Sequence, residues 1–176
     1  MRSLAHFLII LCCLSTPVWA NSDGPVEITD LNWLQNQHTE QQIKQIDEIT
    51  RTNFGEPIRG TKADLELLQR IINKGLISKD DHLAQQALGA VLGDVMVKDM
   101  GLEWKNYKDK LGKSRAACAP GTEQCLFPIT MLSRRMAVGI LPNVADLYQE
   151  TSEMIKPYLP QNPYDAAMLK TQATQD

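Results

Sequence analysis

Side chains that commonly carry chemistry are scarce in this sequence. Its 176 residues include three histidines and four cysteines, and 18 basic residues are outnumbered by 21 acidic ones, which gives a formal net charge of −3. A nucleic-acid-binding protein needs a concentrated basic face, so this balance argues against a nucleic-acid partner. No apolar run reaches the roughly 20 residues that a membrane-spanning helix needs. We therefore expect no stable membrane insertion once the N-terminal signal described below has been removed.

The beginning of the chain has the features of a secretory signal peptide. Arg2 supplies a positive charge, residues 4–14 form a short apolar run, and the segment ends in the small residue Ala20. This order predicts a signal peptide over residues 1–20 that is removed on export. We therefore expect a periplasmic mature protein that begins at Asn21.

The four cysteines form two pairs with different expected fates. Cys12 and Cys13 lie inside the apolar run, and a lipidated cysteine there is the alternative to simple cleavage. The absence of small residues before them argues against it. Cys118 and Cys125 remain in the mature chain and flank six residues rich in turn formers. In an oxidising compartment this spacing predicts a disulfide, with free thiols as the alternative.

Metal, cofactor and catalytic motifs are not recognisable in the sequence. His38 and His82, the two histidines of the mature chain, are not spaced as metal ligands, so we predict no metal and no cofactor. Ser114 and Ser133 do not lie in the strand-turn-helix motif that exposes a catalytic serine. We therefore name no catalytic residue, although a triad can assemble from distant positions.

Apolar spacing and capping signals predict helices on both sides of a short β-rich segment. A capping box opens the first helix, in which Gln42 lies three residues after its cap. Between residues 102 and 129 the apolar residues alternate, which predicts three short antiparallel strands. This order of elements is typical of an α+β fold. The predicted helices begin at Thr39, Thr61, Ser78, Thr130 and Asn143.

The mature chain is long enough for one hydrophobic core. Removal of residues 1–20 leaves 156 residues, and a chain of that size buries roughly 70% of its unfolded surface. We expect a signal peptide (1–20), an N-terminal arm lying against the body (21–38), one globular α+β domain (39–157) and a disordered tail (158–176).

Two glycines form the first candidate binding feature. Gly89 and Gly93 lie one turn apart on a helix rich in small residues, where they leave a groove for close approach of another backbone. Glycine costs roughly 0.8–1 kcal/mol in a helix interior, so two of them require a packing reason. Packing within the chain is the favoured interpretation, and a partner helix or ligand in the groove is the alternative.

Basic side chains form the second candidate feature. Arg134 and Arg135 are adjacent on a predicted helix, so one should face inward and pair with a carboxylate or carbonyls. Anion binding by this pair is the alternative. Five basic residues also line the predicted hairpin, where they either prevent edge-to-edge aggregation or dock an acidic partner. These residues are Lys105, Lys108, Lys110, Lys113 and Arg115.

These features favour an exported, non-catalytic module that binds a partner, either a protein or a component of the cell envelope. The alternative is a small periplasmic hydrolase or ligand-binding enzyme. Its site would assemble from distant residues around Trp104, Arg134 and Arg135.

Several short runs between Ile46 and Tyr148 form a recognisable order. The runs are Asp64-Leu65, Leu68-Gln69-Arg70, Ala87-Leu88-Gly89, Leu92-Gly93-Asp94, Gly101-Leu102 with Trp104, Phe127-Pro128-Ile129-Thr130 and Ser133-Arg134-Arg135. Together they resemble a bacterial family known as domain of unknown function 3806. The resemblance implies a small α+β domain with no assigned activity, and the cysteine-flanked loop has no counterpart in the family pattern.

Overall fold

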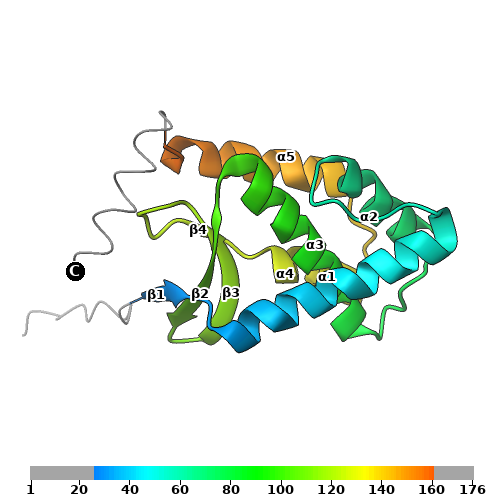
Figure 1. The fold of residues 1–176 in the computed structure, drawn as a ribbon, viewed down its shortest axis with the longest axis horizontal. Helices are drawn as coiled ribbons and strands as arrows, with labels where there is room; N and C mark the ends of the chain where they lie inside the picture. Colours follow the sequence, from blue (N-terminus) through cyan, green and yellow to red (C-terminus); the bar gives the residue numbers. More distant parts are fainter. Residues whose placement is uncertain (1–25, 161–176) are drawn as a thin grey trace, which may run out of the picture.

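The structure, a computed structural model, describes residues 26–160 and is of the expected α+β type. Figure 1 shows the strands gathered at one end, with α1 along one side, α5 along the opposite side and α3 between them. In chain order the elements are β1 (Glu27–Asp30), α1 (Trp33–Phe54), α2 (Ala63–Asn73), α3 (His82–Met100), β2 (Glu103–Asp109), β3 (Gly112–Cys118), β4 (Cys125–Leu126), α4 (Pro128–Ala137), α5 (Val144–Ile155) and the 3-10 helix η1 (Lys156–Tyr158).

The described residues form a sheet of four antiparallel strands in the order β1-β2-β3-β4, not the three strands predicted. The three expected strands are present, and β1 is the additional one, on the free side of β2. Its four residues are mostly exposed and carry no long alternating pattern. Its backbone pairs with β2 at four positions, and two cross-strand ion pairs accompany this pairing. Lys105 Nζ lies 2.6 Å from Asp30 Oδ1, and Lys108 Nζ lies 2.5 Å from Glu27 Oε2.

The first helix begins at Trp33, so the prediction that it begins at Thr39 is wrong. Asn32 caps it, and the backbone N–H and side chain of Gln35 complete a capping box. Thr39 is buried within the helix, where its hydroxyl donates to the Gln35 carbonyl. Of the predicted arm, residues 26–38 form β1 and the first turns of α1, while residues 21–25 lie outside the described part of the chain.

Further predicted features differ or cannot be placed. The helix predicted to begin at Thr130 begins at Pro128, with Phe127 at its N-cap. The third helix begins at His82, because the cap is Asp81, whose carboxylate accepts the Ala84 N–H, rather than Ser78. The predicted signal peptide (1–20) and most of the predicted tail (from residue 161) lie outside the described residues.

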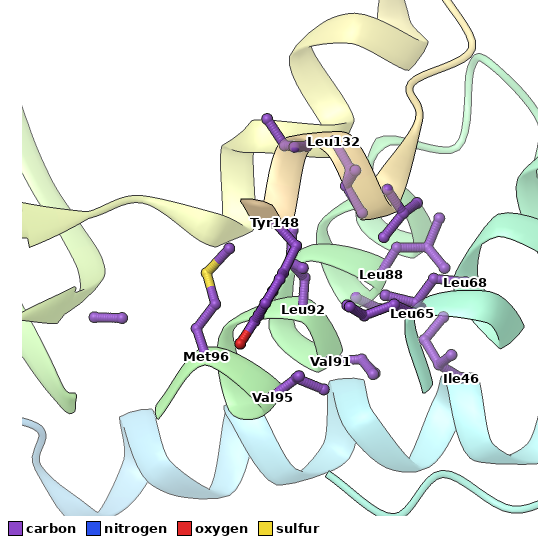
Figure 2. Packing of buried hydrophobic residues seen from close by; sticks show 14 of the residues in the cluster. Ile46, Leu65, Leu68, Leu88, Val91, Leu92, Val95, Met96, Leu132 and Tyr148 are labelled. Atoms are coloured by element: carbon purple, nitrogen blue, oxygen red, sulfur yellow. The ribbon is translucent and has the colours of Figure 1, made fainter. Parts of the chain in front are cut away.

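The core is built around α3, which is apolar on nearly all sides. Figure 2 shows Leu88, Val91 and Leu92 of α3 surrounded by apolar side chains from the other helices. A helix that is apolar all round must be covered all round. The packed side chains that cover it include Ile46 of α1, Leu65 and Leu68 of α2, Leu132 of α4 and Tyr148 of α5.

An ion-pair and hydrogen-bond network ties α5 to the end of α3. The Tyr148 hydroxyl donates to the Asp99 carboxylate, and Lys62 Nζ lies 2.9 Å from Asp99 Oδ2. Burial by itself raises the pKa of Asp99, but the hydrogen bonds from Tyr148 and Lys62 and the charge of Lys62 together lower it below its usual value. Ionised Asp99 therefore stabilises the folded state.

Replacement of Asp99 by asparagine should flatten the loss of stability in acid. A carboxyl whose folded pKa is depressed contributes stability above its unfolded pKa, near 3.8, and loses it as pH falls through the folded pKa. Urea unfolding of Asp99→Asn between pH 3 and pH 6 should show a weaker dependence on pH than the parent. Glu150→Gln, on the exposed face of α5, is the control and should follow the parent curve. An unchanged acid limb for Asp99→Asn would contradict the assignment.

Candidate functional site

A cleft opens between the β2–β3 hairpin and the helices α3 and α4. Its volume is about 540 Å³, within the range of ligand-binding clefts. It exists because β4 pairs with β3 at only two positions, after which Pro128 starts α4 and turns the chain away from the sheet. The lining residues are Gln86, Tyr107, Asp109, Leu111, Gly112, Lys113, Ser114, Arg115, Phe127, Ile129, Thr130 and Arg134.

Gly89 and Gly93 allow α4 and β2 to approach α3 closely. A Cβ atom at Gly89 would lie 2.5 Å from the carbonyl oxygen of Pro128, and one at Gly93 would lie 2.3 Å from Cη2 of Trp104. Parts of the same chain therefore fill the groove, for which packing within the chain was the favoured interpretation and a partner the alternative. Neither glycine lines the cleft, but both set the position of the α4 wall.

Trp104, another candidate binding residue, lies between α3 and the sheet. It is mostly buried against Gly93 and does not line the cleft. Its indole Nε1 is buried and has no hydrogen-bond acceptor among residues 26–160. The structure thus places Trp104 in the packing behind the cleft.

The structure separates the two adjacent arginines of α4. Both are exposed, so the expectation that one faces inward and pairs with a carboxylate or carbonyls is wrong. Leu132, Ser133 and Met136 occupy the buried face instead. Arg134 lines the cleft, whereas Arg135 lies outside it and donates from Nη1 to the Met131 carbonyl of its own helix at 2.7 Å.

Arg115 lines the cleft, although its sequence position marks it only as one of five basic hairpin residues. Its guanidinium donates from Nη1 to Thr39 Oγ1 at 2.5 Å and from Nη2 to Gln42 Oε1 at 2.6 Å. Both acceptors are neutral and buried, and burial lowers the pKa of the guanidinium. Arg115 pairs with Asn106 across the strands, and Asn106 is two residues after Trp104. The period-two pattern therefore places Arg115 on the same face as Trp104, which was the available signal.

The cleft has an excess of positive charge although the chain is acidic overall. Lys113, Arg115 and Arg134 line it, and among residues 26–160 none of them forms an ion pair with a carboxylate. Asp109 is the one acidic lining residue, and its Oδ1 accepts the backbone N–H groups of the hairpin turn. The arrangement is suited to an anionic group, which could accept several charge-assisted hydrogen bonds.

Lys113 also acts weakly on β1. The pKa of Glu27 is lowered mainly by the hydrogen bond and charge of Lys108, and Lys113 makes the smallest contribution. Lys108 forms the ion pair with Glu27, and Lys113 forms no ion pair with a carboxylate among residues 26–160.

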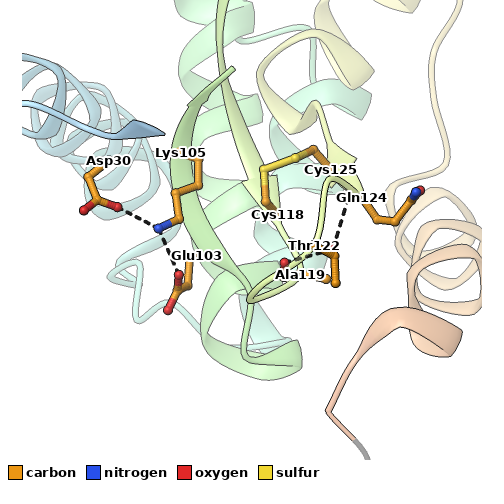
Figure 3. The surroundings of a disulfide bond; sticks show 8 residues. All are labelled: Asp30, Glu103, Lys105, Cys118, Ala119, Thr122, Gln124 and Cys125. Atoms are coloured by element: carbon orange, nitrogen blue, oxygen red, sulfur yellow. Dashed lines mark hydrogen bonds and ion pairs between the residues drawn. A yellow bond between two sulfur atoms is a disulfide. The ribbon is translucent and has the colours of Figure 1, made fainter. Parts of the chain in front are cut away.

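A second hollow, of about 470 Å³, lies beside the predicted disulfide, which the structure confirms. Figure 3 shows the Cys118–Cys125 bond joining β3 to β4 and the loop that follows β3. Lys105 lines this hollow, but ion pairs to Asp30 and Glu103 compensate its charge. This hollow is therefore the weaker candidate for an anionic ligand.

Clusters of metal-binding side chains and membrane-spanning helices are not found in the described part of the chain. Within residues 26–160, no group of three or more His, Cys, Asp or Glu side chains is arranged to hold a metal ion. None of the helices between residues 26 and 160 has the length and apolar character required to cross a membrane.

Comparison with known proteins places this cleft within a segment that matches a known family. Residues 64–148 match the model of the family described as "Domain of unknown function (DUF3806)", a segment that contains every cleft-lining residue. No curated protein matches the sequence. A crystal structure of a protein from Bacteroides thetaiotaomicron VPI-5482 has a similar fold, with a TM-score of 0.66 and 18% identity. The match covers 75% of this chain and 49% of that one, so this chain spans about half of its length.

Proposed function

The chain belongs to the DUF3806 family, and we propose that it is an exported, non-catalytic module that binds a partner through an anionic group held in the cleft. The observation that carries the proposal is the convergence of Lys113, Arg115 and Arg134 on one cleft without a carboxylate partner among the described residues. Arg134 and Lys113 come from opposite walls, α4 and β3.

The environment of Arg115 explains why an anion would be favourable there. A partly buried guanidinium with only neutral acceptors has lost water without gaining an opposite charge. Only two of its five N–H donors have acceptors in the described residues. A bound carboxylate or phosphate would compensate the buried charge.

The chemistry of the lining supports binding rather than catalysis. The cleft contains hydroxyl groups on Ser114 and Thr130, but neither His38 nor His82 is among its lining residues to act as a base. Asp109, the lining carboxylate, is engaged by the hairpin turn. A serine or threonine hydrolase of the triad type needs a histidine base within hydrogen-bond reach of its nucleophile, and neither His38 nor His82 lines this cleft.

Export is proposed from the N-terminal sequence and is consistent with the disulfide. Residues 1–20 have the order of a cleaved signal peptide, and disulfides such as Cys118–Cys125 generally form and persist in oxidising compartments such as the periplasm. The expected partner is therefore another periplasmic protein or a component of the cell envelope.

Photo-crosslinking in living cells tests the proposed function. A photoreactive amino acid at Leu111, which is 88% exposed at the rim of the cleft, should capture a specific partner. The same residue at Met154, exposed on α5, should not give that product. Arg134→Glu should abolish the Leu111 product, while Arg135→Glu, the adjacent charge reversal outside the cleft, should leave it. Capture that is equal from both positions, or unaffected by Arg134→Glu, would contradict the proposal.

A further inference from the structure

One edge of β3 is only partly covered. β4 pairs with β3 at Ala117 and Cys118, so in the described residues the edge from Gly112 to Ala116 faces no strand. The cleft runs along this uncovered edge and is closed on its far side by Ile129, Thr130 and Arg134 of α4.

The direction of the backbone groups at this edge follows from the register. The Ala119 N–H points toward β4, since it donates to the Gln124 carbonyl at 2.9 Å. Successive peptide groups along a strand point to opposite edges, so the N–H and C=O groups of Ala117, Arg115 and Lys113 point the same way as those of Ala119. Ala117 pairs with Leu126 of β4, while Arg115 and Lys113 direct their backbone groups at the uncovered edge.

We propose that this edge takes an extended, acidic segment of another protein as a fifth strand, with carboxylates at alternate positions opposite Lys113 and Arg115. This inference rests on the proposed function and specifies the partner of the same cleft. Addition of a strand to an open edge satisfies the backbone donors and acceptors, and side-chain contacts give the specificity.

The alternation of charge follows from the geometry of the strand. Lys113 and Arg115 are two residues apart, so their side chains lie on the same face and Ser114 lies on the other. Directly opposite side chains on neighbouring strands interact, and opposite charges there are favourable. Carboxylates at positions i and i+2 of the incoming strand would therefore meet the two cations, and Arg134 would contact the segment from α4.

Two other roles for this edge are protection against aggregation and pairing with a second copy of the chain. Each explains fewer features of the cleft than an acidic strand does. Lysines on an open edge prevent association between sheet edges, and Lys110 and Lys113 fit that role. That role requires neither the facing wall of α4 nor an uncompensated Arg134. A second copy paired edge to edge would place Lys113 and Arg115 against their own counterparts, and like charges opposite one another are destabilising.

The test uses the full mature protein and a synthetic peptide, acetyl-TEVEVT-amide, as the probe. Its glutamates alternate, and the control peptide TEEVVT has the same composition with adjacent glutamates. Calorimetric titration should show that the alternating peptide binds more tightly than the control. Arg134→Glu should weaken binding by about tenfold or more, because a charge-assisted contact becomes a repulsion. Arg135→Glu should leave the affinity within about twofold, since that side chain lies outside the cleft.

Amide hydrogen exchange separately tests whether the peptide forms backbone hydrogen bonds with the edge of β3. Peptide binding should slow exchange at the Lys113 and Arg115 N–H groups by about tenfold or more, with no comparable change at Ser114, whose N–H faces β2. Lys113→Pro removes the edge donor at a position where an edge strand tolerates proline, and should weaken binding more than Lys113→Ala, which removes only the charge.

Three outcomes would overturn the inference. The first is equal binding of both peptides, and the second is binding without protection of the Lys113 and Arg115 amides. The third is slow exchange at these amides in the full mature protein without peptide, because a segment of the chain itself would then cover the edge. Failure of the inference differs from failure of the proposed function: crosslinking at Leu111 that depends on Arg134 would still identify a partner, but one that binds without adding a strand.

Discussion

Gly93→Leu should lower the free energy of unfolding by about 3 kcal/mol, the upper part of the range for overpacked cores. The added side chain begins with a Cβ atom 2.3 Å from Cη2 and 2.4 Å from Cζ2 of Trp104, and 2.6 Å from Cγ of Pro128. Atoms at these distances overlap, so Trp104 and the start of α4 must move. Because α4 forms one wall of the cleft, the shift should also disturb the cleft.

Gly89→Ala tests the same contact with the smallest possible side chain. On an exposed helix, alanine would stabilise by roughly 0.5–1 kcal/mol relative to glycine. At Gly89, however, the Cβ would lie 2.5 Å from the Pro128 carbonyl oxygen and 2.6 Å from Ile129 Cα, and backbone atoms yield less easily than the end of a flexible side chain. We therefore expect net destabilisation, opposite in sign to the helix propensity.

Urea unfolding of the purified variants measures both effects. Ala137→Leu, which adds apolar bulk at an exposed position of α4, is the control and should stay within about 0.5 kcal/mol of the parent. Trp104→Ala combined with Gly93→Leu should be less destabilised than the sum of the two single changes, because the leucine enters the space left by the indole. If Gly93→Leu unfolds like the parent, the packing described between α3 and Trp104 is wrong.

Removal of the Cys118–Cys125 bond should lower the free energy of unfolding by about 2 kcal/mol without unfolding the protein. The bond closes a short loop, with a sequence separation of 7, and chain-entropy estimates for loops of this size give about 2.5 kcal/mol. The loop has further support, since the Ala119 N–H donates to the Gln124 carbonyl and the Thr122 hydroxyl to the Ala119 carbonyl. The fold should therefore persist after reduction.

Two measurements check the disulfide prediction. Urea unfolding with and without reductant gives the stability difference, and the double variant Cys118→Ala/Cys125→Ala should match the reduced protein. Alkylation of native, oxidised protein followed by mass measurement should show no labelled thiol in the mature chain. Two labelled thiols would show that the bond is absent from the exported protein.

The cleft could be predicted only in part, because its residues come together from distant positions. Arg134 was a candidate from its place next to Arg135, but the sequence pattern did not distinguish them. The distinction depends on which side of α4 faces the hairpin. Arg115 was counted only as one of five basic hairpin residues, because its hydrogen bonds to Thr39 and Gln42 span 76 and 73 positions.

Local patterns determined much of the fold. The α+β order, the β2–β3 hairpin and the pairing of Cys118 with Cys125 follow from interactions between residues close in sequence, such as capping bonds, apolar periodicity and short loops. The small residues Gly89 and Gly93 likewise indicated close packing before the neighbouring element was known. The proposed signal peptide rests on the same kind of local pattern.

Only the tertiary structure decided which edge of the sheet is open and what faces it. β1 has too little pattern of its own to predict, because its backbone pairing and its ion pairs are with β2 residues about 75 and 81 positions away. The cleft exists because β4 ends after two residues and the start of α4 packs against the glycines of α3. This arrangement leaves Lys113, Arg115 and Arg134 around an uncovered edge of β3. Contacts between residues distant in sequence determine which strand edge stays uncovered, since no interaction between neighbouring residues distinguishes a covered edge from an open one.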